Sequence, residues 1–213
     1  MPWVKIEKNY VFNGPDGKQS LADLFEGRSQ LIVYHFMLTP GSDHLCEGCS
    51  FISDHVDAAR MHFEHNDVSF AAISRAPLSQ IEPVKKRMGW QFRWLSSYGA
   101  DFNYDFHVTI DEAVAPAEYN YTTKVELLQK GEPWFTQGEQ PGLSVFYKDA
   151  AGNVFHTYST YARGGDILIG AYNYLDLTPK GRNEITIMDW LRRHDEYEPS
   201  GSAALCCHTA KHA

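Results

Sequence analysis

The feature that most constrains this chain is a Cys-x-x-Cys pair, Cys46 and Cys49, between an apolar run and a segment with helical spacing. Residues 31–38 form a near-continuous apolar run, so both faces of a strand here would be apolar. This predicts a central strand covered on both faces. After Cys49, apolar residues recur every three or four positions at Ile52, Val56, Ala59 and Phe63. This spacing predicts a helix with one buried stripe, so both sulfurs belong to a strand-to-helix junction.

The junction favours different properties for the two sulfurs. Cys49 lies on the buried stripe, whereas Cys46 comes one turn earlier, where backbone N–H groups lack helical partners. We therefore expect Cys46 to be exposed and its pKa to fall from about 8.5 into a range of roughly 3.5–7.5. An exposed nucleophilic sulfur and a buried resolving sulfur are what dithiol–disulfide exchange requires.

Two neighbours of Cys46 are expected to act on its thiolate in opposite directions. The negative charge of Glu47 should raise the pKa of Cys46, and a protonated His44 should lower it. The sequence leaves the balance between these effects open.

Length, charge and cysteine usage exclude several classes of protein. A chain of 213 residues fits one domain, and a net charge of −8 with scattered Lys and Arg predicts no nucleic-acid partner. We expect no membrane partner and a cytoplasmic location, because we find neither a long apolar segment nor a signal-peptide core. Four cysteines are too few for a disulfide scaffold, which favours a redox motif in a reducing compartment.

The remaining pattern predicts an α/β domain over residues 1–195, with an irregular insertion at about 96–140 and a flexible tail at 196–213. Further strands are predicted at residues 68–74, 90–94, 143–147 and 154–161. Further helices are predicted at residues 79–88, 124–130, 168–175 and 185–193. Ser79 and Glu82 have the spacing of a capping box, and Gly89 is the expected stop. The element order predicts parallel central strands with an antiparallel hairpin at the edge.

Several blocks resemble a bacterial thioredoxin-like family labelled predicted dithiol-disulfide oxidoreductase. The blocks span residues 34–37, 46–51, 73–78, 86–90, 96–103, 155–164 and 172–182. The opening, from Phe12 to Phe36, is similar to redoxin-type members of the same superfamily. The resemblance implies a redoxin-type, thioredoxin-like fold, a mixed central sheet flanked by helices, with Cys46 and Cys49 as catalytic residues. Glu47-Gly48 departs from the Pro-Ser-like pair expected between the cysteines.

Thioredoxin-like sites also place a cis-proline before a later strand, where it presents backbone to the substrate. Pro141, directly ahead of residues 143–147, occupies that position and is the predicted substrate-binding residue together with His44. Whether the Gln140–Pro141 bond is cis or trans stays open at this point.

Two other functions compete with this interpretation. Peroxiredoxins carry Pro and Thr or Ser ahead of the reactive cysteine, where this chain has Thr39 and Asp43, so peroxidase activity is a minor hypothesis. The main alternative is a metal-binding or metal-delivery protein using Cys46, Cys49 and a histidine. The candidate histidines are His35, His107 and His156.

Zinc is not favoured, because a structural site needs about four ligands and the other sulfurs, Cys206 and Cys207, fall in the predicted tail. The sequence therefore predicts a dithiol–disulfide oxidoreductase without a bound metal or organic cofactor. Its expected partners are a disulfide-containing protein or small molecule, and a separate reductase or low-molecular-weight thiol that supplies electrons.

Overall fold

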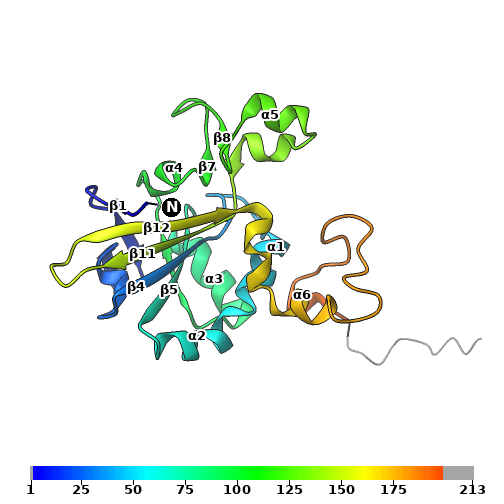
Figure 1. The fold of residues 1–213 in the computed structure, drawn as a ribbon, viewed down its shortest axis with the longest axis horizontal. Helices are drawn as coiled ribbons and strands as arrows, with labels where there is room; N and C mark the ends of the chain where they lie inside the picture. The colour runs from blue at the N-terminus through cyan, green and yellow to red at the C-terminus, as the bar shows by residue number, and fades with distance from the viewer. Residues whose placement is uncertain (1, 199–213) are drawn as a thin grey trace, which may run out of the picture.

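The computed structural model describes residues 2–198, and its core is an eight-stranded sheet (Figure 1). The strands are β1 (Val4–Lys5), β2 (Val11–Gly14), β3 (Gly17–Ser20), β4 (Gln30–His35), β5 (Val68–Ser74), β6 (Arg93–Ser96), β11 (Gly142–Lys148) and β12 (Val154–Tyr161). Their order across the sheet is β1-β12-β11-β4-β5-β6-β2-β3. The three strands β4, β5 and β6 are parallel, and β11 pairs antiparallel with both β4 and β12.

This arrangement confirms the predicted parallel centre and the antiparallel hairpin. Strand β5 has the predicted bounds, whereas β4 ends at His35, three residues before the predicted end. The segment after β4 stays close to its neighbours, because the Phe36 N–H donates to the carbonyl of Ile73. The chain then turns into the cysteine loop.

Alternation along the central strands divides the core into two clusters, one on each face. Leu31 and Val33 belong to the cluster that contains Phe102 and Phe106, whereas Tyr34 belongs to the cluster that contains both cysteines. Helices α2 (Val56–Glu64) and α3 (Leu78–Met88) lie on the cysteine side (Figure 1). The strand period therefore decides which side chains meet the sulfurs.

The 96–140 segment lies on the opposite side of the sheet (Figure 1). It contains α4 (Phe102–Asp105), β7 (Thr109–Ile110), β8 (Glu118–Tyr119), β9 (Thr122–Thr123), α5 (Lys124–Gln129), the 3₁₀ helix η2 (Pro133–Thr136) and β10 (Gly138–Glu139). The predicted helix near residue 124 is confirmed as α5, which begins with a capping box between Thr123 and Glu126. By contrast, α3 begins after Pro77 without a side-chain cap, so the capping box predicted at Ser79 is wrong.

The single helix predicted after Cys49 is two helices, α1 (Glu47–Ser53) and α2, and His55 explains the break. The His55 ring bonds the Phe51 carbonyl through Nδ1 at 2.7 Å, and the His55 backbone N–H donates to Ile52 instead. Because Nδ1 donates, Nε2 is free to accept the N–H of Ala171 at 3.0 Å. A side chain thus replaces one helical bond and links the break to the first turn of α6 (Gly170–Leu175).

The C-terminal part of the described chain departs most from prediction. The helix predicted over residues 185–193 is wrong, since this segment forms turns in which the Asp189 carboxylate accepts the N–H groups of Ile185 and Thr186. Two short 3₁₀ helices, η3 (Ala162–Leu168) and η4 (His194–Glu196), flank this region, and η1 (Asp23–Phe25) lies before β4. Most of the predicted tail, including Cys206 and Cys207, lies outside the described residues. Across residues 2–198, we find no helix with the length and apolar character needed to cross a membrane.

Candidate functional site

The two cysteines lie at the start of α1, directly after the cysteine loop. Cys46 is the N-cap residue, and its Sγ accepts the Cys49 N–H at 3.2 Å. The Sγ of Cys49 accepts the Met37 N–H at 3.5 Å, so the sulfur is held against the end of β4. Both thiols are free.

The predicted exposure of Cys46 is wrong. Cys46 is only 8% exposed and Cys49 is 1% exposed. Met188, far along the chain, comes close to this site. Its sulfur lies 3.3 Å from the position that the Cβ of a side chain on Gly48 would occupy, and the Cys46 sulfur lies 3.9 Å from the same position. Any larger residue in place of Gly48 would meet this thioether.

The two thiols differ in pKa in the predicted direction. The pKa of Cys46 is lowered chiefly by the hydrogen bond from the Cys49 thiol, and the backbone N–H groups of Cys49 and Gly48 lower it further. Burial and the negative charge of Glu47 act in the opposite direction. Burial, followed by the hydrogen bond with Cys46, raises the pKa of Cys49. Cys46 is therefore the more readily ionised thiol of the pair.

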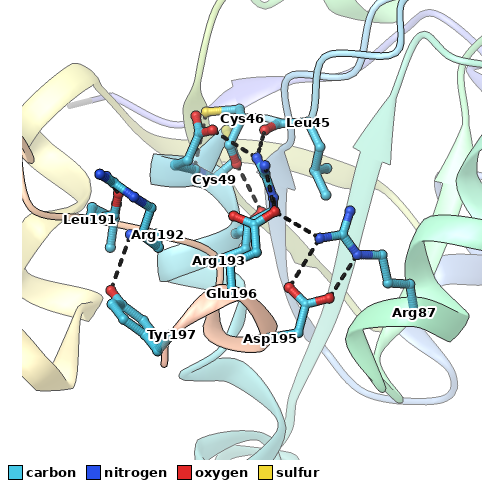
Figure 2. Close-up of polar contacts among 12 residues, drawn as sticks. Leu45, Cys46, Cys49, Arg87, Leu191, Arg192, Arg193, Asp195, Glu196 and Tyr197 are labelled. Atoms are coloured by element: carbon cyan, nitrogen blue, oxygen red, sulfur yellow. Dashed lines mark hydrogen bonds and ion pairs between the residues drawn. The ribbon is translucent and has the colours of Figure 1, made fainter. Parts of the chain in front are cut away.

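An arginine that sequence reasoning missed meets Glu47 beside Cys46. Arg193 donates to the carbonyl of Leu45 and to the carboxylate of Glu47, both at 2.7 Å, and it also pairs with Glu196 (Figure 2). Arg87 on α3 in turn pairs with Asp195 and Glu196. We call residues 186–197 the strap, because these contacts hold that segment against the cysteine loop.

We expect Glu47→Gln to lower the pKa of Cys46, because the carboxylate charge opposes the thiolate. The shift should be below about one unit, since Glu47 is partly solvent-exposed and Arg193 already offsets its charge. The measurement is the pH dependence of Cys46 alkylation, with the exposed Glu82→Gln on α3 as the control. An unchanged or higher pKa in Glu47→Gln would contradict the assigned effect.

Both sulfurs line a groove of about 780 Å³ with mostly apolar walls. Its floor includes Tyr34, Met37 and Ile52, and its walls come from two distant segments. One wall contains Glu132, Trp134 and Phe135, and the other contains Thr186, Ile187 and Met188 of the strap. A volume of this size suits an organic molecule or the side chains around a protein disulfide.

Pro141 lines the same groove at the beginning of β11, but its peptide bond is trans. The cis alternative is therefore wrong. The Pro141 carbonyl accepts the hydroxyl of Tyr119 at 2.5 Å, and Tyr119 also accepts the N–H of Ala162. The structure thus brings Pro141 together with Cys46 and Cys49, with its carbonyl already bonded.

The histidines are not brought to the sulfurs. His44 is exposed and is not among the groove residues, and His107 is exposed as well. His35 is buried on the other face of the sheet, beside Ser144 and the ring of Phe106. His156 bonds Ser159. Among residues 2–198, no three His, Cys, Asp or Glu side chains are placed to hold a metal ion, so the histidine-containing metal site finds no support.

This chain is similar to several solved structures. Peroxidoxin BcpB from Mycobacterium tuberculosis superposes with a TM-score of 0.50 at 11% identity, over 82% of this chain and 96% of that chain. A putative protein disulfide isomerase from Bacteroides thetaiotaomicron gives 0.42 at 16% identity, over 86% and 96%. BsSco, of the Sco family of cytochrome c oxidase assembly proteins, gives 0.39 at 14% identity, over 77% and 89%.

The fold is thioredoxin-like: a mixed sheet flanked by helices, with the cysteine pair between a central strand and a helix. At these identities the likeness shows the fold alone. No curated protein matches the sequence. Residues 1–197 match the model of a family described as bacterial protein of unknown function (DUF899), and the chain belongs to that family.

Proposed function

We propose that this protein is a dithiol–disulfide oxidoreductase that acts through Cys46 and Cys49. The Cys46 thiolate attacks a substrate disulfide, forming a mixed disulfide and releasing one substrate sulfur as a thiolate. Cys49 then attacks the Cys46 sulfur, the mixed disulfide breaks, and the second substrate sulfur leaves. Two electrons pass to the substrate, the two released thiolates take up protons, and Cys46 and Cys49 become a disulfide.

The observation that carries this proposal is the pair of free thiols with opposite pKa shifts at one groove. Cys46 has a lowered pKa, as an attacking sulfur requires. Cys49 has a raised pKa, so it stays protonated until the mixed disulfide forms. Both thiols line the groove into which a substrate would enter.

The substrates that fit are disulfides of a protein or a small molecule with apolar groups beside the sulfurs. We propose that a separate reductase or a low-molecular-weight thiol returns the electrons, without a bound organic cofactor. His44 and Pro141 remain proposed substrate contacts, and of the two only Pro141 lies in the groove.

Covalent trapping tests the order of attack. Cys49→Ser should hold a stable mixed disulfide with glutathione after exposure to glutathione disulfide, because the second attack is lost. The protein used here and in the later thiol measurements carries Cys206→Ser and Cys207→Ser, so that Cys46 and Cys49 are its two cysteines. In this background Cys46→Ser should form little or no adduct, since Cys49 is buried and has a raised pKa. Intact mass spectrometry measures the adducts, and equal trapping in both variants would contradict the assignment of Cys46 as nucleophile.

A further inference from the structure

The hydroxyl of Tyr34 is buried below the groove without a hydrogen-bond partner among residues 2–198. Tyr34 lies on β4, is 3% exposed, and lines the groove together with Cys46 and Cys49. Leaving a buried hydroxyl unpaired is unfavourable, and most such groups in folded proteins have partners. We therefore expect a state, other than the reduced pair of thiols, in which this hydroxyl gains a hydrogen-bond acceptor.

The Tyr34 hydroxyl acts on the sulfur of Cys49, whose pKa it lowers. The backbone N–H of Met37 already donates to the same sulfur at 3.5 Å. The titratable groups with the largest effects on the pKa of Cys49 are Cys46 and Tyr34. The hydroxyl of Tyr119, which also interacts with Cys49, is already bonded to Pro141 and Ala162. Tyr34 is therefore the side-chain donor best placed to respond to a charge on Cys49.

We propose that the Tyr34 hydroxyl and the Met37 N–H form a donor pair that stabilises the Cys49 thiolate when it attacks the mixed disulfide. This inference rests on the proposed function and deepens it. Burial holds the pKa of Tyr34 well above its ordinary value, so Tyr34 keeps its proton and acts as a donor rather than as a base. Hydrogen bonds to an ionised group are the stronger kind, so the contact forms as the charge develops.

In this step the Cys49 sulfur bonds to the Cys46 sulfur, and the bond from Cys46 to the substrate sulfur breaks. The electron pair of that bond leaves with the substrate sulfur, which takes up the proton that Cys49 has lost through solvent. In this step Cys49 is oxidised and the departing substrate sulfur is reduced, whereas Cys46 exchanges one disulfide partner for another. Tyr34 neither gains nor loses a proton overall.

The test uses Tyr34→Phe, which removes the hydroxyl and keeps the ring. Excess aromatic disulfide dithiobis(nitrobenzoate) releases one coloured thiolate when Cys46 attacks and a second when Cys49 resolves. We expect the second phase to slow by about tenfold or more in Tyr34→Phe, with the first phase nearly unchanged. An unchanged second phase would overturn the proposal.

A second measurement separates this role from a structural one. In a Cys46→Ser background, Tyr34→Phe should raise the pKa of Cys49, read from alkylation against pH, without lowering the unfolding temperature, because no hydrogen bond is lost in the resting state. The control Tyr161→Phe, whose hydroxyl bonds the carbonyl of Phe106, should instead lower the unfolding temperature and leave the Cys49 pKa unchanged. A Cys49 pKa that does not respond to Tyr34→Phe would overturn the proposal.

The two measurements also distinguish failure of this inference from failure of the proposed function. If the wild type shows no second phase, Cys49 does not resolve and the oxidoreductase proposal fails together with the role of Tyr34 in it. If the second phase is present but is insensitive to Tyr34→Phe, the oxidoreductase proposal stands and the donor role of Tyr34 is wrong.

Discussion

Cys46→Ser is expected to reduce disulfides no faster than the solution does without protein. The serine hydroxyl does not ionise near neutral pH, so the attacking anion is lost, whereas the buried Cys49 has a raised pKa and cannot replace it. The measurement is the steady-state reduction of glutathione disulfide with dithiothreitol as electron donor. Full loss is the largest effect that we expect from any single substitution.

Cys49→Ser is the matched variant for that experiment. It keeps the Cys46 sulfur and loses the internal resolving thiol, so turnover should continue only as fast as an external thiol cleaves the mixed disulfide. Its rate should therefore depend on dithiothreitol concentration more steeply than the wild-type rate. Substantial turnover in Cys46→Ser would contradict the assigned nucleophile.

The fold should lose stability in mild acid because of His35. Burial, followed by the neighbouring His156, lowers the pKa of His35 to about 3, and its Nδ1 has no hydrogen-bond partner among the described residues. The unfolded chain regains a histidine pKa of about 6.5, so below that pH it binds a proton that the folded protein does not. The stability that the protein gains from keeping His35 neutral is fully present above about pH 6.5, and it is lost progressively as the pH falls to about 3.

The expected cost is roughly 2 kcal/mol of unfolding free energy between about pH 6.5 and 5, rising to about 4 kcal/mol near pH 3. His156, whose pKa burial also lowers, adds in the same direction. Urea unfolding at a series of pH values measures how the unfolding free energy changes with pH. His35→Gln should make this dependence flatter between about pH 6.5 and 5, where carboxylates titrate little. The exposed His62→Gln should keep the wild-type slope, and equal slopes in both variants would contradict the assignment.

Local sequence patterns predicted several elements of the sheet and its surroundings. Strands β5, β11 and β12 follow from short apolar runs, and the hairpin between the last two follows from the turn at residues 149–153. The helix predicted near residue 124 is α5. The Cys-x-x-Cys spacing also predicted correctly that the pKa of Cys46 is lowered. Each of these features depends on residues close together in the chain.

The features that the sequence patterns did not predict depend on residues that are far apart in the chain. Met188 approaches Gly48 beside Cys46, and Arg193 pairs with Glu47, although more than a hundred residues separate the partners in each case. The break between α1 and α2 depends on His55 accepting the N–H of Ala171, which periodicity within the helix does not contain. The strap lies mostly in the segment for which the sequence predicts a helix over residues 185–193, and its contacts are with residues far away in the chain.

The most direct test of the central claim is the equilibrium reduction potential of Cys46 and Cys49. Metal-free protein is titrated against glutathione redox buffers, and the thiols are alkylated and counted by mass, with Cys46→Ser alongside. We predict one reversible two-electron transition between about −270 and −120 mV that disappears in the variant. If both thiols stay reduced at every ratio of reduced to oxidised glutathione, and no Cys46–Cys49 disulfide forms, the proposed oxidoreductase function is contradicted.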